Sequence, residues 1–339
     1  MSPTLKRGKF ITLLGGAAAV WPLAAHAQAS KNIPRLCFLT FDPATSRSTR
    51  FDAFFHGLVD LGYVDGKTIT IDYLSADGHG ERFPTLAAEC LRLKADIIAV
   101  STTPATQAAK KATPTVPIVM IGLGDPVGTG LVESLAQPGG NVTGMSMMVP
   151  EVATKRLELL KEAVPGISRV LVLSYLADPI APLQVKAMQQ AAGSLGVTLQ
   201  IYDIRTADDL PAAFDAGAKE GAEGLLATAE SIFVVQRARV SELAARYRLP
   251  AMYPYTIQVA EAGGLMAYDV DYPAHSKLTT SLTIHSQELP YWVQSDWSGS
   301  LAVSPPIRPP PPLTSRTVRT LSSCRRWLAL AVAVAQPMD

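Results

Sequence analysis

Several polar side chains stand directly after apolar runs, where turns from strand to helix would place them together. Ser101, Thr102 and Thr103 precede Pro104, and a hydroxyl residue followed by a proline at the first helical position is typical of a helix start. The free N–H groups and hydroxyls of such a start could hold the carboxylate of a small molecule. They could equally well cap their own helix, so the pattern leaves both roles open.

Acidic and aromatic side chains occupy comparable positions. Glu230 lies in the turn 228–231, where it could pair with a ligand amine or cap its own helix. Phe41 and Tyr175 each follow an apolar run and could sandwich an apolar or aromatic group, although core packing would explain them as well. Asp125 could bind an amine or belong to a hinge. Together these residue types suit an amino-acid-like solute. The candidate ligand-binding residues are Thr40, Phe41, Thr102, Thr103, Thr106, Asp125, Ser174, Tyr175, Glu230, Tyr255 and Asp269.

The sequence offers little that would support an enzyme. Its five histidines are scattered, and no spacing of His, Cys, Asp or Glu matches a metal site. It contains no Gly-x-Ser-x-Gly elbow, and the glycines of 122–128 depart from the dinucleotide fingerprint. We therefore expect no catalytic residue, no metal and no cofactor.

The three cysteines, Cys37, Cys90 and Cys324, are too far apart for a zinc or redox motif. Cys37 and Cys90 fall within apolar patterns and are interpreted as small buried hydrophobic residues. A disulfide between these two remains possible in an oxidising compartment, and the sequence does not decide the matter.

The elements that must position the candidate residues occur twice along the chain. Four strands are predicted in each copy, and they follow one another in the same order and with nearly the same spacing. Amphipathic helices are predicted between them, and the first helix of each copy ends in Leu-Gly. Such recurrence in register indicates a duplicated unit. The predicted strands are 34–41, 69–73, 95–100 and 117–121 in the first copy and 168–175, 198–202, 222–227 and 250–253 in the second. The predicted helices are 51–61, 83–93 and 104–112, and then 183–195, 210–219 and 234–246.

Alternating strands and helices predict an α/β fold with two doubly wound parallel-sheet (Rossmann-like) lobes joined by a hinge. In such sheets ligands bind beyond the carboxyl ends of the strands, so two facing lobes would hold a ligand between them. We expect an N-terminal lobe over 33–143, a C-terminal lobe over 144–254 and a hinge or return strand over 255–273. The hinge would begin near the turn-forming segment 139–144.

The N-terminus has the three-part pattern of a cleavable export signal over residues 1–27. Lys6, Arg7 and Lys9 form the positive region, an apolar stretch follows, and Ala25-His26-Ala27 is a cleavage site. The pair Lys6-Arg7 leaves both a Tat-like and a Sec export route open. Lipidation is not expected, because the cleavage site has no cysteine. The pattern predicts a periplasmic protein. The net charge of +1 provides no strong field for binding nucleic acid.

These segments resemble the type I periplasmic solute-binding proteins of ABC transporters, related to the tryptophan- and tyrosine-binding members. The resemblance implies a non-enzymatic protein that binds a small-molecule solute and delivers it to a permease and ATPase complex in the inner membrane, and we expect it to be a monomer. The ligands of the family are diverse, so the resemblance does not identify the solute. The segments that carry it are 10–16, 103–106, 124–128, 137–144, 155–162 and 261–266.

The pattern of the family is not recognisable after residue 273. The segment 274–339 is rich in Pro, Ser and Thr and includes the run Pro309 to Pro312, for which polyproline II or disorder is the physical expectation. A frameshifted C-terminus is one hypothesis, and a copy of the protein that no longer functions would follow from it. A periplasmic ligand-sensing input protein is the other alternative to a transport component.

Overall fold

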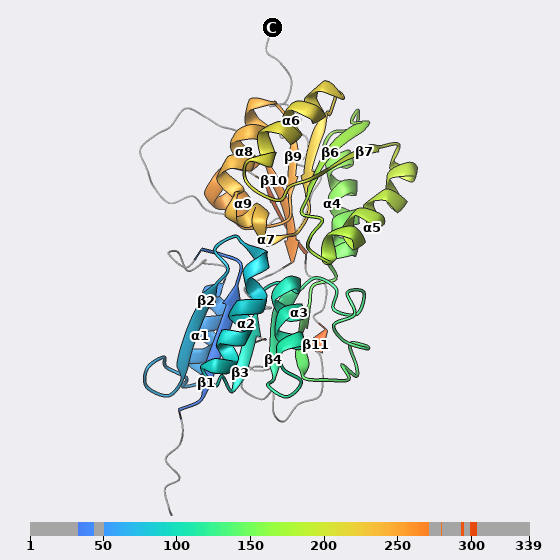
Figure 1. Cartoon of the computed structure of the whole chain (residues 1–339). Helices are drawn as coiled ribbons and strands as arrows, with labels where there is room; N and C mark the ends of the chain where they lie inside the picture. The colour runs from blue at the N-terminus through green and yellow to red at the C-terminus, as the bar shows by residue number, and fades with distance from the viewer. Residues whose placement is uncertain (1–32, 44–50, 271–278, 280–292, 295–298, 304–339) are drawn as a thin grey trace, which may run out of the picture.

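The computed structural model describes residues 33–43, 51–270, 279, 293–294 and 299–303, and every structural statement below refers to these residues. They form two lobes, each built around one sheet with helices on both faces (Figure 1). The predicted export signal lies outside the described residues. None of the helices in the described part of the chain combines the length and apolar character needed to cross a bilayer.

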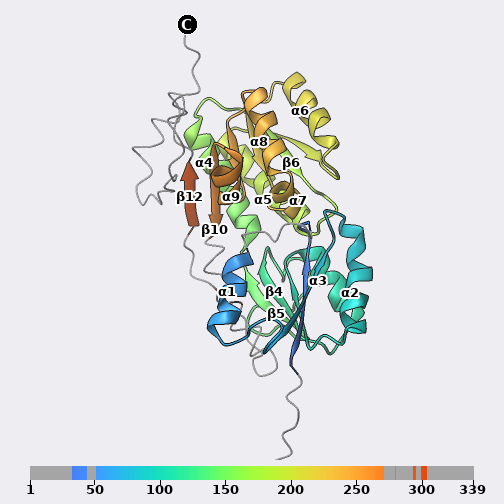
Figure 2. The same cartoon turned by 90° about the vertical axis from the view of Figure 1, so that its left-hand side faces the viewer.

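The first lobe contains a sheet with the strand order β11-β5-β4-β3-β1-β2. All its pairings are parallel. Figure 2 shows α1 on one side of this sheet and α2 and α3 on the other. The strands are β1 (Arg35–Thr40), β2 (Thr70–Ser75), β3 (Ile97–Val100), β4 (Ile118–Leu123), β5 (Val142–Ser146) and β11 (Val293–Gln294). The helices are α1 (Asp52–Asp60), the 3₁₀ turn η2 (Gly80–Arg82), α2 (Phe83–Arg92) and α3 (Thr103–Ala112).

The second lobe repeats this arrangement with the order β12-β10-β9-β8-β6-β7. The two orders correspond strand for strand, which confirms the predicted doubly wound architecture and its duplication. Only the pairing of β12 with β10 is antiparallel among those described. The strands are β6 (Arg169–Ser174), β7 (Thr198–Asp203), β8 (Gly224–Ala227), β9 (Ala251–Tyr253), β10 (Met266–Val270) and β12 (Gly299–Val303). The helices are α4 (Val149–Ala163), α5 (Ile180–Leu195), α6 (Asp209–Lys219), α7 (Ser231–Val235), α8 (Arg237–Arg246) and α9 (Thr256–Ala262).

The central strands are buried on both faces, as their continuous apolar runs require. In β1, Leu36 and Phe38 pack with α1, whereas Cys37 and Leu39 face the cluster that includes α2 and α3. β6 alternates in the same way between the α4–α5 side and the α6–α8 side. Each sheet therefore has an apolar layer on both faces, and the polar groups gather at the strand ends.

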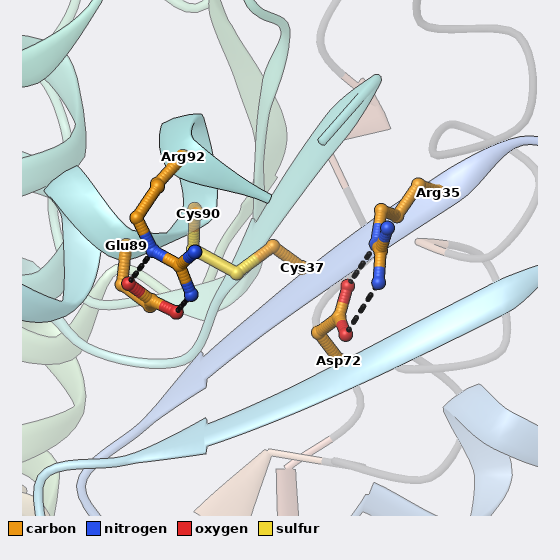
Figure 3. Close-up of a disulfide and its surroundings, with 6 residues drawn as sticks. All are labelled: Arg35, Cys37, Asp72, Glu89, Cys90 and Arg92. Atoms are coloured by element: carbon orange, nitrogen blue, oxygen red, sulfur yellow. Dashed lines mark hydrogen bonds and ion pairs between the residues drawn. A yellow bond between two sulfur atoms is a disulfide. The ribbon is translucent and has the colours of Figure 1, made fainter. Parts of the chain in front are cut away.

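Cys37 and Cys90 form a disulfide between β1 and α2, with their Cα atoms 5.7 Å apart (Figure 3). Both residues are fully buried, as the sequence predicted, but they are paired, which the sequence left undecided. Because 53 positions separate them, the bond ties the first strand of the lobe to a distant helix. On the surface of α2 beside it, Arg92 pairs with Glu89.

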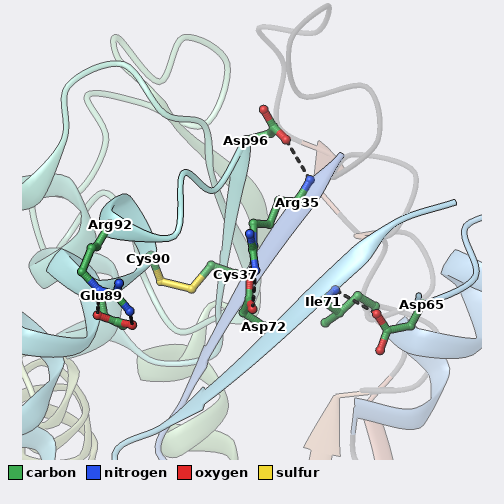
Figure 4. Close-up of polar contacts among 9 residues, drawn as sticks. All are labelled: Arg35, Cys37, Asp65, Ile71, Asp72, Glu89, Cys90, Arg92 and Asp96. Carbon is green, nitrogen blue, oxygen red and sulfur yellow. Dashed lines mark hydrogen bonds and ion pairs between the residues drawn. A yellow bond between two sulfur atoms is a disulfide. The ribbon is translucent and has the colours of Figure 1, made fainter. Parts of the chain in front are cut away.

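Ionic and backbone contacts fix the amino end of the first sheet (Figure 4). The guanidinium of Arg35 donates to Asp72 across β1 and β2, with an Nε–Oδ2 distance of 2.6 Å. The backbone N–H of the same arginine donates to Asp96 at 2.7 Å, and that of Ile71 donates to Asp65 at 2.9 Å. These contacts lie away from the carboxyl ends of the strands and are structural.

Several sequence predictions differ from the structure. The single helix predicted over 234–246 is two helices, α7 and α8, which meet at Gln236. The turn at 139–141 leads into β5, so the first sheet extends past residue 143 and the chain leaves it only after Ser146. Residues 255–273 include α9 and β10, and β10 is a parallel partner of β9 in the second sheet.

Two strands follow residue 273, where the pattern of the family was not recognisable in the sequence. β11 pairs with β5 in the first sheet, and β12 pairs with β10 in the second. After β10 the chain therefore returns to the first lobe and then comes back to the second. The remaining residues of 274–339, apart from Thr279, lie outside the described part of the chain.

Gly144 provides a test of the packing between β4 and β5. Its φ is +142°, and an added Cβ would lie 2.7 Å from the backbone nitrogen of Met120. Because a backbone atom cannot move aside as a side chain can, we expect Gly144→Ala to lower the free energy of unfolding by about 1–3 kcal/mol. Gly140→Ala is the matched control, since no atom lies within 4 Å of its added Cβ. Urea denaturation measures both, and equal stabilities for the two variants would contradict the expectation.

Candidate functional site

The carboxyl ends of the strands in the two sheets face each other, so side chains from both copies meet between the lobes. Phe41 follows β1 and Tyr175 follows β6, and their ring centroids are 6.5 Å apart. Thr103, at the start of α3, forms a side-chain hydrogen bond with Asp178 of the second lobe. A Cβ added at Gly80 would lie 3.3 Å from the hydroxyl of Tyr175, so η2 approaches the same ring.

The first lobe contributes hydroxyl residues to the region between the lobes. Thr102 caps α3 by accepting a hydrogen bond from the backbone N–H of Ala105 at 3.2 Å. The helix begins at Thr103, one residue before the predicted Pro104. Thr106 donates back to the carbonyl of Thr102 at 2.8 Å, and Thr40 accepts from the N–H of Asp42 at 3.2 Å. Thr102, Thr106 and Thr40 thus make local bonds, whereas Thr103 extends to the other lobe.

Glu230 is the centre of a buried polar network in the second lobe and is only 2% exposed. It occupies the N-cap position of α7, but its carboxyl does not cap that helix. Instead Gln184 donates to its Oε1 at 2.6 Å, the N–H of Tyr175 donates to its Oε2 at 3.3 Å, and the hydroxyl of Thr228 also contacts Oε2. Gln184 is held in turn by the N–H of Ala229 at 2.9 Å.

The hydroxyl of Thr228 lies between two acceptors, the carbonyl of Leu173 at 3.0 Å and the carboxyl of Glu230. The carbonyl of Leu173 also accepts the backbone N–H of Thr228 at 3.0 Å, so the hydroxyl proton is available to Glu230. The hydrogen bonds from Thr228, Tyr175 and Gln184 favour the charged form of Glu230, and burial opposes them. Burial raises the pKa of Glu230 to about 8, and the nearby charge of Asp178 adds to the rise.

Asp178 is a second buried acid and is 5% exposed. Its Oδ1 accepts the N–H of Ile180 at 3.1 Å, at the start of α5, and Thr103 of the first lobe contacts its carboxyl. Burial raises the pKa of Asp178 to about 7, against the lowering effect of these hydrogen bonds. Two carboxyls with raised pKa values therefore lie close together where the lobes meet.

Arg156 of α4 lies deeper in the second lobe and is 2% exposed. Its Nε donates to the carbonyl of Tyr268 at 2.7 Å, and its Nη2 donates to that of Pro254 at 3.1 Å. Burial lowers the pKa of Arg156, and the charges of Asp269 and other nearby acids oppose this effect. Asp269, which is 3% exposed, accepts the N–H of Thr256 at 3.3 Å. The arginine therefore joins α4 to the ends of β9 and β10.

The other predicted site residues are placed less centrally. Ser174 ends β6, is fully buried, and its Oγ has no hydrogen-bond partner among the described residues. The hydroxyl of Tyr255 donates to the carbonyl of Ala229 at 2.9 Å, next to the Glu230 network. Asp125 accepts the N–H of Gly128 at 2.8 Å and so organises its own turn. Asp125 therefore serves the turn after β4, whereas Tyr175 contacts groups of both lobes.

Three polar residues of this region were not predicted from the sequence: Arg156, Asp178 and Gln184. The positions of Arg156 and Gln184 could have indicated a buried polar group, because each stands on the apolar stripe of a helix. Arg156 lies on the stripe formed by Val152, Ala153 and Leu157, and Gln184 lies on that of Ile180 and Met188. Asp178 precedes Pro179 in an ordinary turn, so its burial comes only from the packing of the lobes.

The network predicts a dependence of stability on pH. The pKa of Glu230 is raised from 4.5 to about 8, so the stabilisation from its protonated form is complete below pH 4.5 and is lost as the pH rises through about 8. We expect the free energy of unfolding to fall by about 1 kcal/mol per pH unit in this window. Glu230→Gln, whose amide can donate to Thr228, should make that dependence shallower and leave the part that comes from Asp178. Urea denaturation at pH 5.5, 7.0 and 8.5 measures it, and parallel curves for the two proteins would refute the assignment.

Within the described residues no group of three or more His, Cys, Asp or Glu side chains is arranged to hold a metal ion. What the strand ends offer is hydroxyls, an aromatic pair and buried acids. These groups can bind and orient a small molecule.

Solved structures share this two-lobe arrangement. A conserved domain protein from Vibrio cholerae has a TM-score of 0.72 and 24% identity, over 80% of this chain and 92% of that one. An ABC domain from Streptococcus pneumonia, solved in complex with L-Trp, has a TM-score of 0.71 and 21% identity, over 80% of this chain and 91% of its own. The fold thus defines the class of α/β proteins in which two doubly wound lobes face each other.

The family model for ABC transporter substrate binding proteins matches residues 42–284, and the chain belongs to that family. It is therefore a substrate-binding protein and not an enzyme. The match continues past residue 273, where the sequence pattern had suggested a break. A tyrosine-binding protein from Clostridioides difficile is 29% identical over 219 residues, which is 65% of this chain and 62% of the relative. The chain thus matches less than two thirds of the length of this relative.

Proposed function

We propose that this protein binds a small amino-acid-like or carboxylate solute between its lobes in the periplasm and delivers it to an ABC permease in the inner membrane. The observation that carries the proposal is the meeting of strand ends from both copies, through Phe41 with Tyr175 and through Thr103 with Asp178. A solute held there would contact both lobes and so favour their closed arrangement.

The chemistry of the facing groups supports a solute with polar and apolar parts. The start of α3 supplies hydroxyls and a helix N-terminus for a carboxylate. Asp178 is an acid that an amine could approach when the lobes separate, and Phe41 and Tyr175 offer rings for an apolar group. The relatives add support, since one is named as a tyrosine-binding protein and another was solved with L-Trp. We expect the exported chain to act as a monomer.

A thermal-shift screen of the mature chain against amino acids and small carboxylates tests the proposal, with calorimetry on each hit. We expect at least one of these solutes to raise the melting temperature. A cooperative melt that no solute shifts would contradict the proposal.

Tyr175→Ala locates the binding site. Because the ring lies against both Phe41 and η2, its removal should weaken binding of a hit about tenfold, the effect of losing about 1.4 kcal/mol of aromatic contact. Tyr202→Ala is the matched control, because that tyrosine lies on β7 and its hydroxyl donates to Glu220 within the second lobe. Equal affinities for wild type and Tyr175→Ala would place the solute elsewhere.

A further inference from the structure

Asp178 is the buried acid that the contact between the lobes covers. It precedes α5, and the first turn of that helix packs against the first lobe: an added Cβ at Gly124 would lie 2.6 Å from the side chain of Ile180. One turn later, an added Cβ at Gly128 would lie 3.0 Å from Leu183. Thr103 contributes its hydrogen bond to the carboxyl from the first lobe. Separation of the lobes would remove these neighbours and expose Asp178 to water.

Glu230, in contrast, is enclosed within the second lobe. Its partners Gln184, Thr228 and Tyr175 belong to that lobe and stay in place when the lobes separate. Its burial disfavours the charged form of the carboxyl. The two acids repel each other when both are charged, so an ionised Asp178 makes ionisation of Glu230 harder, and the reverse also holds.

We propose that Asp178 and Glu230 form a proton-binding site whose occupancy couples the closing of the lobes to pH. Closing the lobes over Asp178 takes up a proton, because the covered carboxyl loses its water and faces a second acid. Opening returns the carboxyl to water, and the proton leaves to solvent. The inference deepens the proposed function, since the motion that it regulates is the one by which a solute would be held.

Other charged groups lie around the pair. Burial, Asp178, Glu81 of η2 and Asp203 at the end of β7 raise the pKa of Tyr175, whereas Arg205, which pairs with Asp203 at 2.8 Å, lowers it. The buried guanidinium of Arg156 donates to two backbone carbonyls, and its positive charge interacts with Glu230.

The direction of the coupling follows from the geometry and agrees with the raised pKa of Asp178, which is about 7 in the arrangement described. A carboxyl whose pKa is raised in one arrangement stabilises that arrangement at low pH. This stabilisation is lost as the pH rises through the raised pKa. The closed form should therefore dominate near pH 5.5, and the open form should gain population above pH 8.

Small-angle X-ray scattering of the mature chain without solute, at pH 5.5, 7.0 and 8.5, tests the coupling. We expect the radius of gyration of the wild type to increase with pH. Asp178→Asn, whose amide oxygen can still accept from Thr103, should stay compact throughout. Thr103→Val, which removes the bond between the lobes but no titrating group, should be more open and still respond to pH. Asp203→Asn removes a nearby acid of the same charge and should behave as wild type.

A wild-type radius that is constant across this range would overturn the proposal, as would an equal response in Asp178→Asn. Far-UV circular dichroism establishes that each variant is folded, and Thr103→Val keeps the test decisive if Asp178→Asn does not fold. The scattering needs no solute, so its outcome is separate from that of the thermal-shift screen. A pH response without any solute hit would support the proton site and contradict solute binding. A solute hit without a pH response would support solute binding and contradict the proton site.

Discussion

Replacing Arg156 with alanine should lower the free energy of unfolding by about 3–5 kcal/mol. The guanidinium is buried and donates to the carbonyls of Tyr268 and Pro254, so the truncation leaves both acceptors without this donor and opens a cavity of several side-chain atoms. It also removes the positive charge that acts on Asp269 and Glu230. Urea denaturation at pH 7 measures the loss.

Lys155→Ala is the matched control for this experiment. Lys155 is the preceding residue on the same helix, but its side chain is exposed and pairs only with Glu158, at 2.9 Å. Surface ion pairs of this kind contribute about 0.2–1 kcal/mol. If Arg156→Ala were no more destabilising than the control, the junction of α4 with β9 and β10 would not depend on the arginine.

Removing the disulfide in the double variant Cys37→Ala, Cys90→Ala should cost about 2–4 kcal/mol. The bond closes a long loop within the first lobe, between β1 and α2, and so restricts the unfolded chain. Because the apolar surroundings tolerate alanine, the fold should persist, with a lower melting temperature. Calorimetric melts of the oxidised wild type and of the double variant measure the difference.

A reducing agent provides the internal control. It should lower the melting temperature of the wild type towards that of the double variant and leave the double variant unchanged. A wild type that melts at the same temperature in both conditions would show that Cys37 and Cys90 are not paired in solution.

The architecture could be predicted from the residues alone, because apolar periodicity is a local property that a single chain displays. The runs that became β1 and β6 recur in register, and parallel sheets with short connections leave few topologies to choose from. The sequence also indicated which turns stand at the carboxyl ends of the strands, and hence Phe41, Thr103, Tyr175 and Glu230. The division of one predicted helix into α7 and α8 could not be predicted from the sequence, because both helices have the same apolar character.

The contacts of those residues, in contrast, depend on how distant elements pack. Cys37 and Cys90 lie in two separate patterns, and their pairing depends on how α2 packs on β1. The buried acid pair arises because α5 packs against the loop after β4, which covers Asp178, while Gln184 and Thr228 enclose Glu230 from different elements. Burial and electrostatic interaction are properties of groups brought together from distant positions. For that reason the local pattern identified Glu230 but could not assign its proton or find its partner Asp178.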